Sequence, residues 1–397
     1  MNDTYLNKRY SNLVIILVLL FPIFINSVKI LSSLILLILV ILGTYIAISK
    51  KQNPFKIKKL KIFSWLTVGY FGVMLLSILM ADGLNAEFHH LGRKLQFLLA
   101  PLIALAVFKV EISLKNFLLS IKAGLIIIGL IVIVQVLLGY ERPSGMMNQN
   151  IFGDIAVAML FLSIVRVFNE QPKERTLTLF SAVLGIFAIV LSGNRGSWIS
   201  ALILSTLYIL IIYKYYLHNN TKYRLIVFGL LATILILASN TQTFNNQMLN
   251  TKVAMERWSA GNIQKSSIGE RLNMWTSGLK AAQESPLIGH GYRNANKAAQ
   301  KYTDKDIGYT HLHNEYITNL VSAGIVGLLS LLALIFLPMI IFYQKIKDKE
   351  VHYYALMGFF LCAGYATFGL SHIAFGEEHI NAFYVLFMGL LLPRVVR

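Results

Sequence analysis

Two histidines separated by a single residue stand directly before a long apolar stretch. They are His311 and His313, and Asn314 follows them before the apolar run that begins at Tyr316. A neutral imidazole can take a proton from a hydroxyl group, and a neighbouring asparagine can orient a substrate or cap a helix. The pattern indicates a candidate general base. Two ordinary histidines at the end of a membrane helix are the plainer interpretation.

The same histidines do not predict a metal site. A catalytic zinc ion usually takes three protein ligands, and only His290 or Glu315 could complete the set here. The sequence has no His-Glu-x-x-His motif, no P-loop and no glycine-rich dinucleotide motif. We therefore expect chemistry that uses no metal ion, no nucleotide and no other cofactor.

An arginine interrupts two apolar runs in the segment 192–198, which reads Ser-Gly-Asn-Arg-Gly-Ser-Trp. The break is too short for a real loop, so Arg195 is held near the edge of the bilayer. Glycines let a ligand approach the backbone, and the N-terminus of the following helix favours an anion. The segment therefore predicts an anion site. The alternative is that Arg195 reaches to lipid phosphates while Trp198 anchors the helix at the interface.

Three further arginines lie in polar segments of the chain. Arg142 precedes the apolar run that starts near residue 151, Arg271 has helical surroundings, and Arg293 follows a glycine-rich turn. Each could donate charge-assisted hydrogen bonds to an anionic substrate. In the plainer interpretation, Arg142 is a loop residue before a helix capped by Asn148 or Asn150, and Arg271 is a solvated helix residue.

The composition is that of an integral membrane protein. Of 397 residues, 56% are hydrophobic and 14% are charged, and the mean hydropathy is +0.64, whereas soluble proteins carry about 25% charged residues. A soluble two-domain enzyme and a disordered chain are excluded. The net charge of +18 comes from basic residues that set orientation and meet membrane lipids. Because no compact polar domain presents them, they do not predict nucleic-acid binding.

Span counting predicts an all-α polytopic membrane protein. A helix needs about 20 apolar residues to cross the bilayer, which gives about twelve transmembrane helices. With both termini cytoplasmic, 22 Lys and Arg residues fall in inner segments and five in the short outer segments, as the positive-inside rule requires. The expected spans are 12–28, 30–49, 62–81, 93–108, 116–138, 151–168, 177–193, 197–213, 224–239, 315–343, 353–373 and 380–393.

One long polar stretch, 240–314, separates the helices expected in 1–239 from those expected in 315–397. The charge distribution places this stretch outside the cytoplasm. Helix-like periodicity around Arg271 and a turn-rich segment at 286–291 predict a partly helical cap on one integral membrane domain. The candidate polar residues all lie on this outer side, where the cap closes over the membrane.

Four motifs follow one another along residues 140–325. They are Ser-Gly-Asn-Arg-Gly-Ser-Trp (192–198), Arg-Leu-x-x-Trp (271–275), Pro-Leu-Ile-Gly-His-Gly (286–291) and His-Leu-His-Asn-Glu-Tyr (311–316). Together they resemble the bacterial O-antigen ligase and polymerase superfamily. The stretch from Arg142 to Asp154 favours the ligase branch. Two residues depart from the pattern: Asn194 stands where many relatives have serine, and Leu312 replaces a small residue between the histidines.

The resemblance implies an inverting glycosyltransferase of the bacterial inner membrane with its active site on the periplasmic face. A glycan would move from undecaprenyl diphosphate to a hydroxyl of lipid A-core during lipopolysaccharide biosynthesis, without metal or ATP. Arg195 and Arg271 would clamp the diphosphate, with Arg142 or Arg293 as a third partner. His313 would be the base, with His311 as second choice, and Asn314 would orient His313 or the acceptor.

Other functions fit the same features. An O-antigen polymerase would use the same lipid-linked donor. A lipid-linked sugar transporter is a different class, but transporters tend to carry ionisable residues near the bilayer midplane, whereas here they gather at the outer edge. A non-catalytic assembly protein would not need arginines beside histidines at the membrane surface. The lack of a large domain after the last span disfavours the protein-glycosylating relatives.

Overall fold

The computed structural model describes residues 8–82, 88–217, 242–259, 267–292, 294–303 and 311–396, and these residues form helices and connecting turns without a β-strand. The α-helices are α1 (Lys8–Phe24), α2 (Lys29–Ser49), α3 (Lys58–Asp82), α4 (Leu95–Phe108), α5 (Leu114–Leu137), α6 (Gln149–Ser163), α7 (Pro172–Leu191), α8 (Arg195–Ile212), α10 (Gln242–Ser259), α11 (Ser267–Glu284), α12 (Ala295–Gln300), α13 (Glu315–Lys345), α14 (His352–Phe368) and α15 (Glu378–Val395). Shorter helical segments are η2 (Phe88–Lys94), η3 (Val167–Asn169), η4 (Tyr213–Leu217) and η6 (Ala374–Gly376).

Within the described ranges, eight helical segments are long and apolar enough to cross a membrane. They are Ile30–Ser49, Lys58–Ala81, Leu91–Phe108, Leu114–Leu137, Gln149–Asn169, Pro172–Leu191, Arg195–Tyr215 and Glu315–Lys345. The predicted all-helical character is confirmed for the described residues, and these eight segments are consistent with a multi-pass membrane protein.

Four of the expected spans are not among these eight. The expected spans 12–28 and 353–373 correspond to α1 and α14, which have 17 residues each, at the lower limit of the length that crosses a bilayer. The span expected at 380–393 corresponds to α15, whose ends carry Glu378 and Arg394. The span expected at 224–239 lies outside the described residues.

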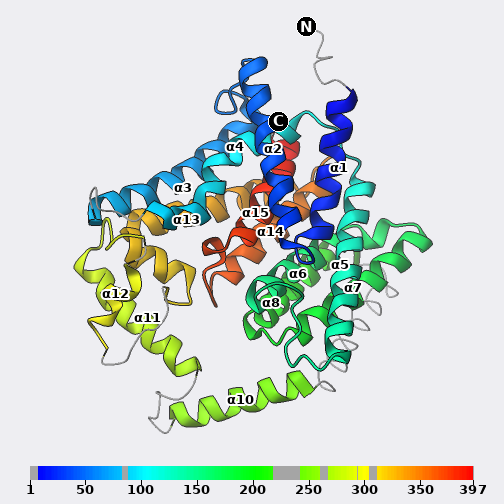
Figure 1. Cartoon of the computed structure of the whole chain (residues 1–397). Coiled ribbons are helices and arrows are strands. Elements are labelled where there is room, and N and C mark those ends of the chain that lie inside the picture. Colours follow the sequence, from blue (N-terminus) through cyan, green and yellow to red (C-terminus); the bar gives the residue numbers. More distant parts are fainter. Residues whose placement is uncertain are drawn as a thin grey trace.

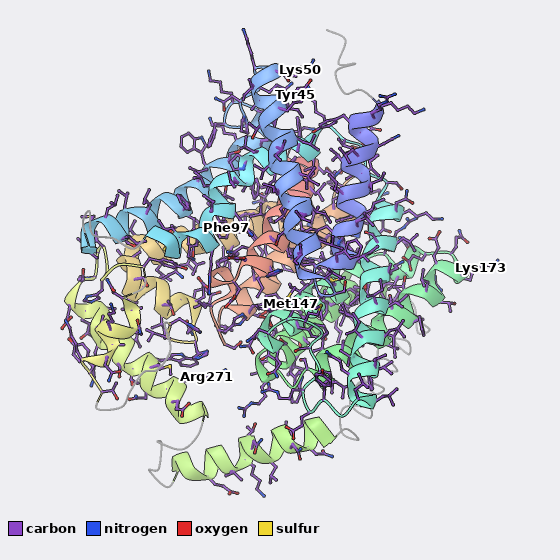
Figure 2. The ribbon with its side chains drawn as sticks, in the orientation of Figure 1. Tyr45, Lys50, Phe97, Met147, Lys173 and Arg271 are labelled. Atoms are coloured by element: carbon purple, nitrogen blue, oxygen red, sulfur yellow. The ribbon has the colours of Figure 1, made fainter. Side chains whose placement is uncertain are left out.

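Three helices form the centre of the molecule. All residues of 151–163 in α6, 355–365 in α14 and 379–393 in α15 are buried. A helix that is apolar around its whole circumference must be enclosed by other elements. α15 packs against α4, α14 and α3, and α14 packs against α13, α6 and α8 (Figure 1). Phe97 of α4 lies in this interior, whereas Lys50 and Lys173 lie at the periphery (Figure 2).

Several helix ends lie together on one side of the molecule. A cavity of about 750 Å³ is lined by Ser11, Lys59, Lys109, Tyr354 and Arg394 among others. These residues belong to the start of α1, the start of α3, the end of α4, the start of α14 and the end of α15. The beginning of the first described helix and the end of the last one thus lie on the same side, at the top of Figure 1.

The described residues of the polar stretch before α13 include the helices α10, α11 and α12, which lie on the opposite side from the start of α1 and the end of α15 (Figure 1). α11 and α12 build a small separate core of alanines with Met274, Leu312 and Val321. The expectation that this stretch is partly helical is confirmed.

The turn 286–291 attaches α11 to the membrane helices by inserting into a kink of α13. The kink lies at Ala323 and Gly324, and Gly324 has a φ of 62°. The N–H groups of His290 and Gly291 donate to the carbonyls of Val321 and Ser322, both at 2.9 Å. A Cβ on Gly324 would lie 2.2 Å from the carbonyl carbon of Leu287. Only glycine satisfies both the positive φ and the close approach of the two backbones.

We expect the Gly324→Ala substitution to detach this turn. Gly324 has a φ of 62° and a ψ of −160°, a region that is essentially restricted to glycine, so an alanine there would be strained by about 1–3 kcal/mol, and its Cβ would collide with Leu287. Hydrogen–deuterium exchange should therefore accelerate at His290 and Gly291. Gly72→Ala is the matched control, because nothing lies within 4 Å of its Cβ position. Unchanged exchange in Gly324→Ala would show that the turn is held by other contacts.

Candidate functional site

The first turn of α13 is fixed by a buried polar network. Glu315 accepts a hydrogen bond at Oε1 from Asn319 Nδ2 at 2.7 Å, and at Oε2 from the N–H of Phe375 at 3.0 Å. The hydroxyl of Tyr70 on α3 lies 3.4 Å from Glu315 Oε1 and receives a 2.7 Å hydrogen bond from Lys94 Nζ. Glu315, Lys94 and Tyr70 are almost completely buried. Because buried charges must be compensated, this network determines where α13 begins.

Asn314 caps α13 and joins it to the loop after α14. Its Oδ1 accepts from the N–H of Ile317 at 3.0 Å, and its Nδ2 donates to the carbonyl of Leu370 at 3.3 Å. The helix-capping interpretation of Asn314 is confirmed. The cap fixes the direction in which the preceding histidines leave the helix.

α11 holds the histidine segment from the other side. Trp275 Nε1 donates to the carbonyl of Leu312 at 2.9 Å, and Leu312 is fully buried. A Cβ on Gly278 would lie 2.6 Å from Leu312 Cδ1, so the leucine side chain packs directly on the backbone of α11. The unusual residue between the two histidines therefore fixes the segment to α11.

His311 and His313 lie side by side, with ring centroids 4.5 Å apart. His313 has a φ of 50°, a left-handed backbone that is uncommon outside glycine. Burial, and then the charges of His311 and Arg271, lower the pKa of His313 to about 4. His313 is therefore neutral at pH 7, the state in which an imidazole accepts a proton. The same electrostatic interactions show that Arg271 of α11 (Figure 2) lies near the histidines.

A second group of cations surrounds the N-terminus of α8. Arg142 Nη2 donates to the carbonyl of Gly193 at 2.9 Å, and Asn194 caps the helix by accepting from the N–H of Gly196 at 3.1 Å. Arg195 Nη1 donates to the hydroxyl of Thr251 on α10 at 2.8 Å. Burial, and then the charge of Arg195, lower the pKa of Arg142. Two guanidinium groups at a helix N-terminus form a suitable site for an anion.

A buried aspartate and histidine connect the two groups. Asp154 of α6 accepts from Ser197 of α8 at 2.7 Å, and its Oδ2 lies 3.3 Å from His372 Nδ1. His372 lies in the loop between α14 and α15. Burial, and then the charges of His311, His313 and Arg271, lower its pKa. The Asp154–His372 pair therefore has the α8 group on one side and the histidine group on the other.

The structure thus associates Arg142 with Arg195, and Arg271 with His311 and His313. Arg293 lies outside the described residues. His290 faces α11, where its Nε2 lies 2.8 Å from the carbonyl of Ala281. In the part of the chain that the structure describes, no three His, Cys, Asp or Glu residues gather as a metal site would require.

Sequence reasoning missed His372 and gave Asp154 no role. A signal for Asp154 was present, because it is a carboxylate in an otherwise apolar stretch, and such residues are costly in a membrane. His372 had no comparable signal. Its position follows from the path of the loop after α14, which brings it from far along the sequence to Asp154.

We expect His313 to titrate near pH 4 rather than near its ordinary value of 6.5. The neighbouring cations disfavour the imidazolium, so His311→Gln and Arg271→Gln should each raise the pKa of His313. NMR of the purified protein with ¹⁵N-labelled histidine would measure this titration. A wild-type pKa of about 6.5, unaffected by either substitution, would contradict the described environment.

Residues 180–332 match the family described as O-antigen ligase. An uncharacterized protein of Haemophilus influenzae is 27% identical over 355 residues, which are 86% of this chain and 87% of that protein. The ComP-specific O-oligosaccharyltransferase of Acinetobacter baylyi is 28% identical over 216 residues, which are 53% of this chain but only 37% of the relative.

The family match contains Arg195, Arg271 and both histidines, and it ends after the kink of α13. It therefore covers the α8, α11 and histidine segments of the site, whereas Arg142, Asp154 and His372 lie outside it, and it confirms the resemblance seen in the sequence motifs. Residues 180–332 are therefore similar to the O-antigen ligase family.

Proposed function

We propose that the protein is an O-antigen ligase, an inverting glycosyltransferase that moves a glycan from undecaprenyl diphosphate to a hydroxyl of lipid A-core. The observation that carries the proposal is the arrangement around the Asp154–His372 pair. Arg142 and Arg195 lie on one side, and Arg271 lies with the neutral His313 on the other. A diphosphate donor needs the cations, and a hydroxyl acceptor needs the neutral base.

In the proposed reaction, the acceptor hydroxyl attacks the anomeric carbon of the donor sugar. The bond from that carbon to the diphosphate oxygen breaks, and the diphosphate leaves with increased negative charge. Arg195 and Arg271, with Arg142 or Arg293, stabilise that charge by hydrogen bonds. His313, or in second place His311, takes the proton of the hydroxyl. The diphosphate linkage supplies the driving force, so the reaction needs neither a metal ion nor a nucleotide.

The proposal includes a location in the bacterial inner membrane with about twelve spans. Both termini would be cytoplasmic and the site periplasmic. The basic residues support this orientation, since they concentrate in the segments that would face the cytoplasm. The start of α1 and the end of α15 lie on the same side, which is consistent with an even number of crossings.

The test should include two other acceptors. In a polymerase, a second lipid-linked glycan would take the position of lipid A-core. The relative from Acinetobacter baylyi is named for transfer to ComP, so a protein hydroxyl is a further candidate. A transporter fits less well, because the arginines and histidines described above gather on one side of the molecule rather than at mid-depth.

The direct test mixes the purified protein with undecaprenyl-diphosphate-linked glycan and lipid A-core, without added metal or nucleotide. We expect a glycan-shifted lipid A band. His313→Ala should lower the rate by at least about 100-fold, because it removes the base. His352→Ala is the matched control, since His352 lies on the opposite side at the start of α14 and contacts the carbonyl of Ile346.

The outcomes separate the alternatives. Growth of the glycan on its lipid carrier would favour the polymerase, and transfer to an added protein would favour an oligosaccharyltransferase. A His313→Ala variant with near wild-type transfer would exclude His313 as the base. Absence of any transfer by the wild type would contradict the ligase proposal.

A further inference from the structure

Asp154 is a carboxylate that the assigned site residues do not explain. It lies in the second turn of α6 and is fully buried. Its Oδ1 accepts from the hydroxyl of Ser197, and that hydroxyl accepts in turn from Asn194 Nδ2 at 2.6 Å. A Cβ on Gly153 would lie 2.5 Å from Ser197 Oγ, so α6 and α8 approach closely here. Asp154 is thus attached to the same turn that carries Arg195.

The other oxygen of Asp154 faces His372. Asp154 Oδ2 and His372 Nδ1 lie 3.3 Å apart, and the two side chains are 1% and 5% exposed. Neither of these atoms, nor His372 Nε2, makes a hydrogen bond within the described residues. Leaving one buried polar atom unpaired costs about 1–3 kcal/mol. Because Asp154 Oδ2 and His372 Nδ1 face each other, a proton shared between them would satisfy both atoms.

The surroundings of this pair are rich in groups that oppose protonation. His311, His313 and Arg271 interact electrostatically with His372, and each of them disfavours a positive charge on it. Arg195 is the first residue of α8, and Gly196, which follows it, lies against Ser371. The carboxylate of Glu315 is already engaged by Asn319 and by the N–H of Phe375. Asp154 is therefore positioned to balance a proton placed on this histidine cluster.

From this arrangement we infer that Asp154 and His372 are a positioning pair for the transfer reaction, in which Asp154 is the counter-ion for the proton that the histidine cluster takes up. The inference rests on the proposed function. The proton comes from the acceptor hydroxyl when its oxygen bonds to the anomeric carbon, and the leaving diphosphate keeps the electron pair of the broken bond. His313 receives the proton, and His372 beside Asp154 stabilises the added positive charge.

The test uses Asp154→Asn, which removes the ionisable carboxyl group but keeps an oxygen that can accept from Ser197. We expect kcat to fall by at least about 10-fold with little change in KM for the donor, because the variant weakens the base and leaves the arginines intact. Loss of the negative charge lowers the pKa of nearby imidazoles. The acid limb of the kcat–pH profile should therefore move to lower pH by about one unit.

Two further variants make the result specific. Asp154→Asn and His372→Gln should lower kcat by similar factors, and the double variant should be no slower than either, because the two residues act as a unit. Glu170→Gln is the matched control, since Glu170 is another buried carboxylate and lies 2.5 Å from Lys122, away from the site. It should leave the position of the acid limb unchanged.

Three results would overturn the inference. They are an Asp154→Asn variant with wild-type kcat, a fall in kcat with no movement of the acid limb, and multiplicative losses in the double variant. Failure of the proposed function is distinguishable, since the wild type would then transfer to no acceptor. In that case histidine NMR still decides: Asp154→Asn must lower the pKa of His372, and an unchanged pKa contradicts the pairing.

Discussion

The carboxylate of Glu315 contacts several separate parts of the chain. It receives hydrogen bonds from its own helix and from the loop before α15, and it lies against Tyr70 of α3. Through Tyr70 it is linked to Lys94, whose Nζ also lies 4.9 Å from the ring centre of Tyr292 in the segment before α12. Removing one member of such a buried charged network is far costlier than removing a surface pair.

This constraint explains how a site can be precise at the edge of a membrane. His311 and His313 come just before Glu315. Asn314 and Trp275 hold the histidine segment by hydrogen bonds and leave it little freedom. The arginines come from other elements, at the start of α8 and on α11. Gathering these cations near one another is unfavourable until an anion binds. Such an arrangement favours the binding of an anionic ligand, and this supports a diphosphate donor.

Much of this organisation could be predicted from the sequence, for identifiable reasons. Long apolar runs define membrane helices, and Asn148 and Asn314 are recognisable caps. The motif around Arg195 and the histidine pair could be recognised because they lie next to apolar runs, where polar residues are costly. The membrane character of α1, α14 and α15 was harder to establish, since short or partly polar helices satisfy length rules poorly.

The pairing of distant residues could not be predicted. Nothing in the local sequence indicates that Asp154 meets His372, because that contact depends on how α6 and the loop after α14 pack. The kink at Gly324 was similarly hidden, since the surrounding residues read as one continuous apolar helix. Its cause is the turn 286–291, whose backbone replaces the hydrogen bonds that the kink leaves unmade.

In the proposed reaction, the two cationic groups hold one diphosphate beside the histidines. A cryo-EM structure of the purified protein with bound undecaprenyl diphosphate would test it most directly. We expect the diphosphate to contact both Arg195 and Arg271, with one of its oxygens facing the His311–His313 pair. A diphosphate bound to only one of these arginines, or at the opposite side of the membrane helices, would contradict it.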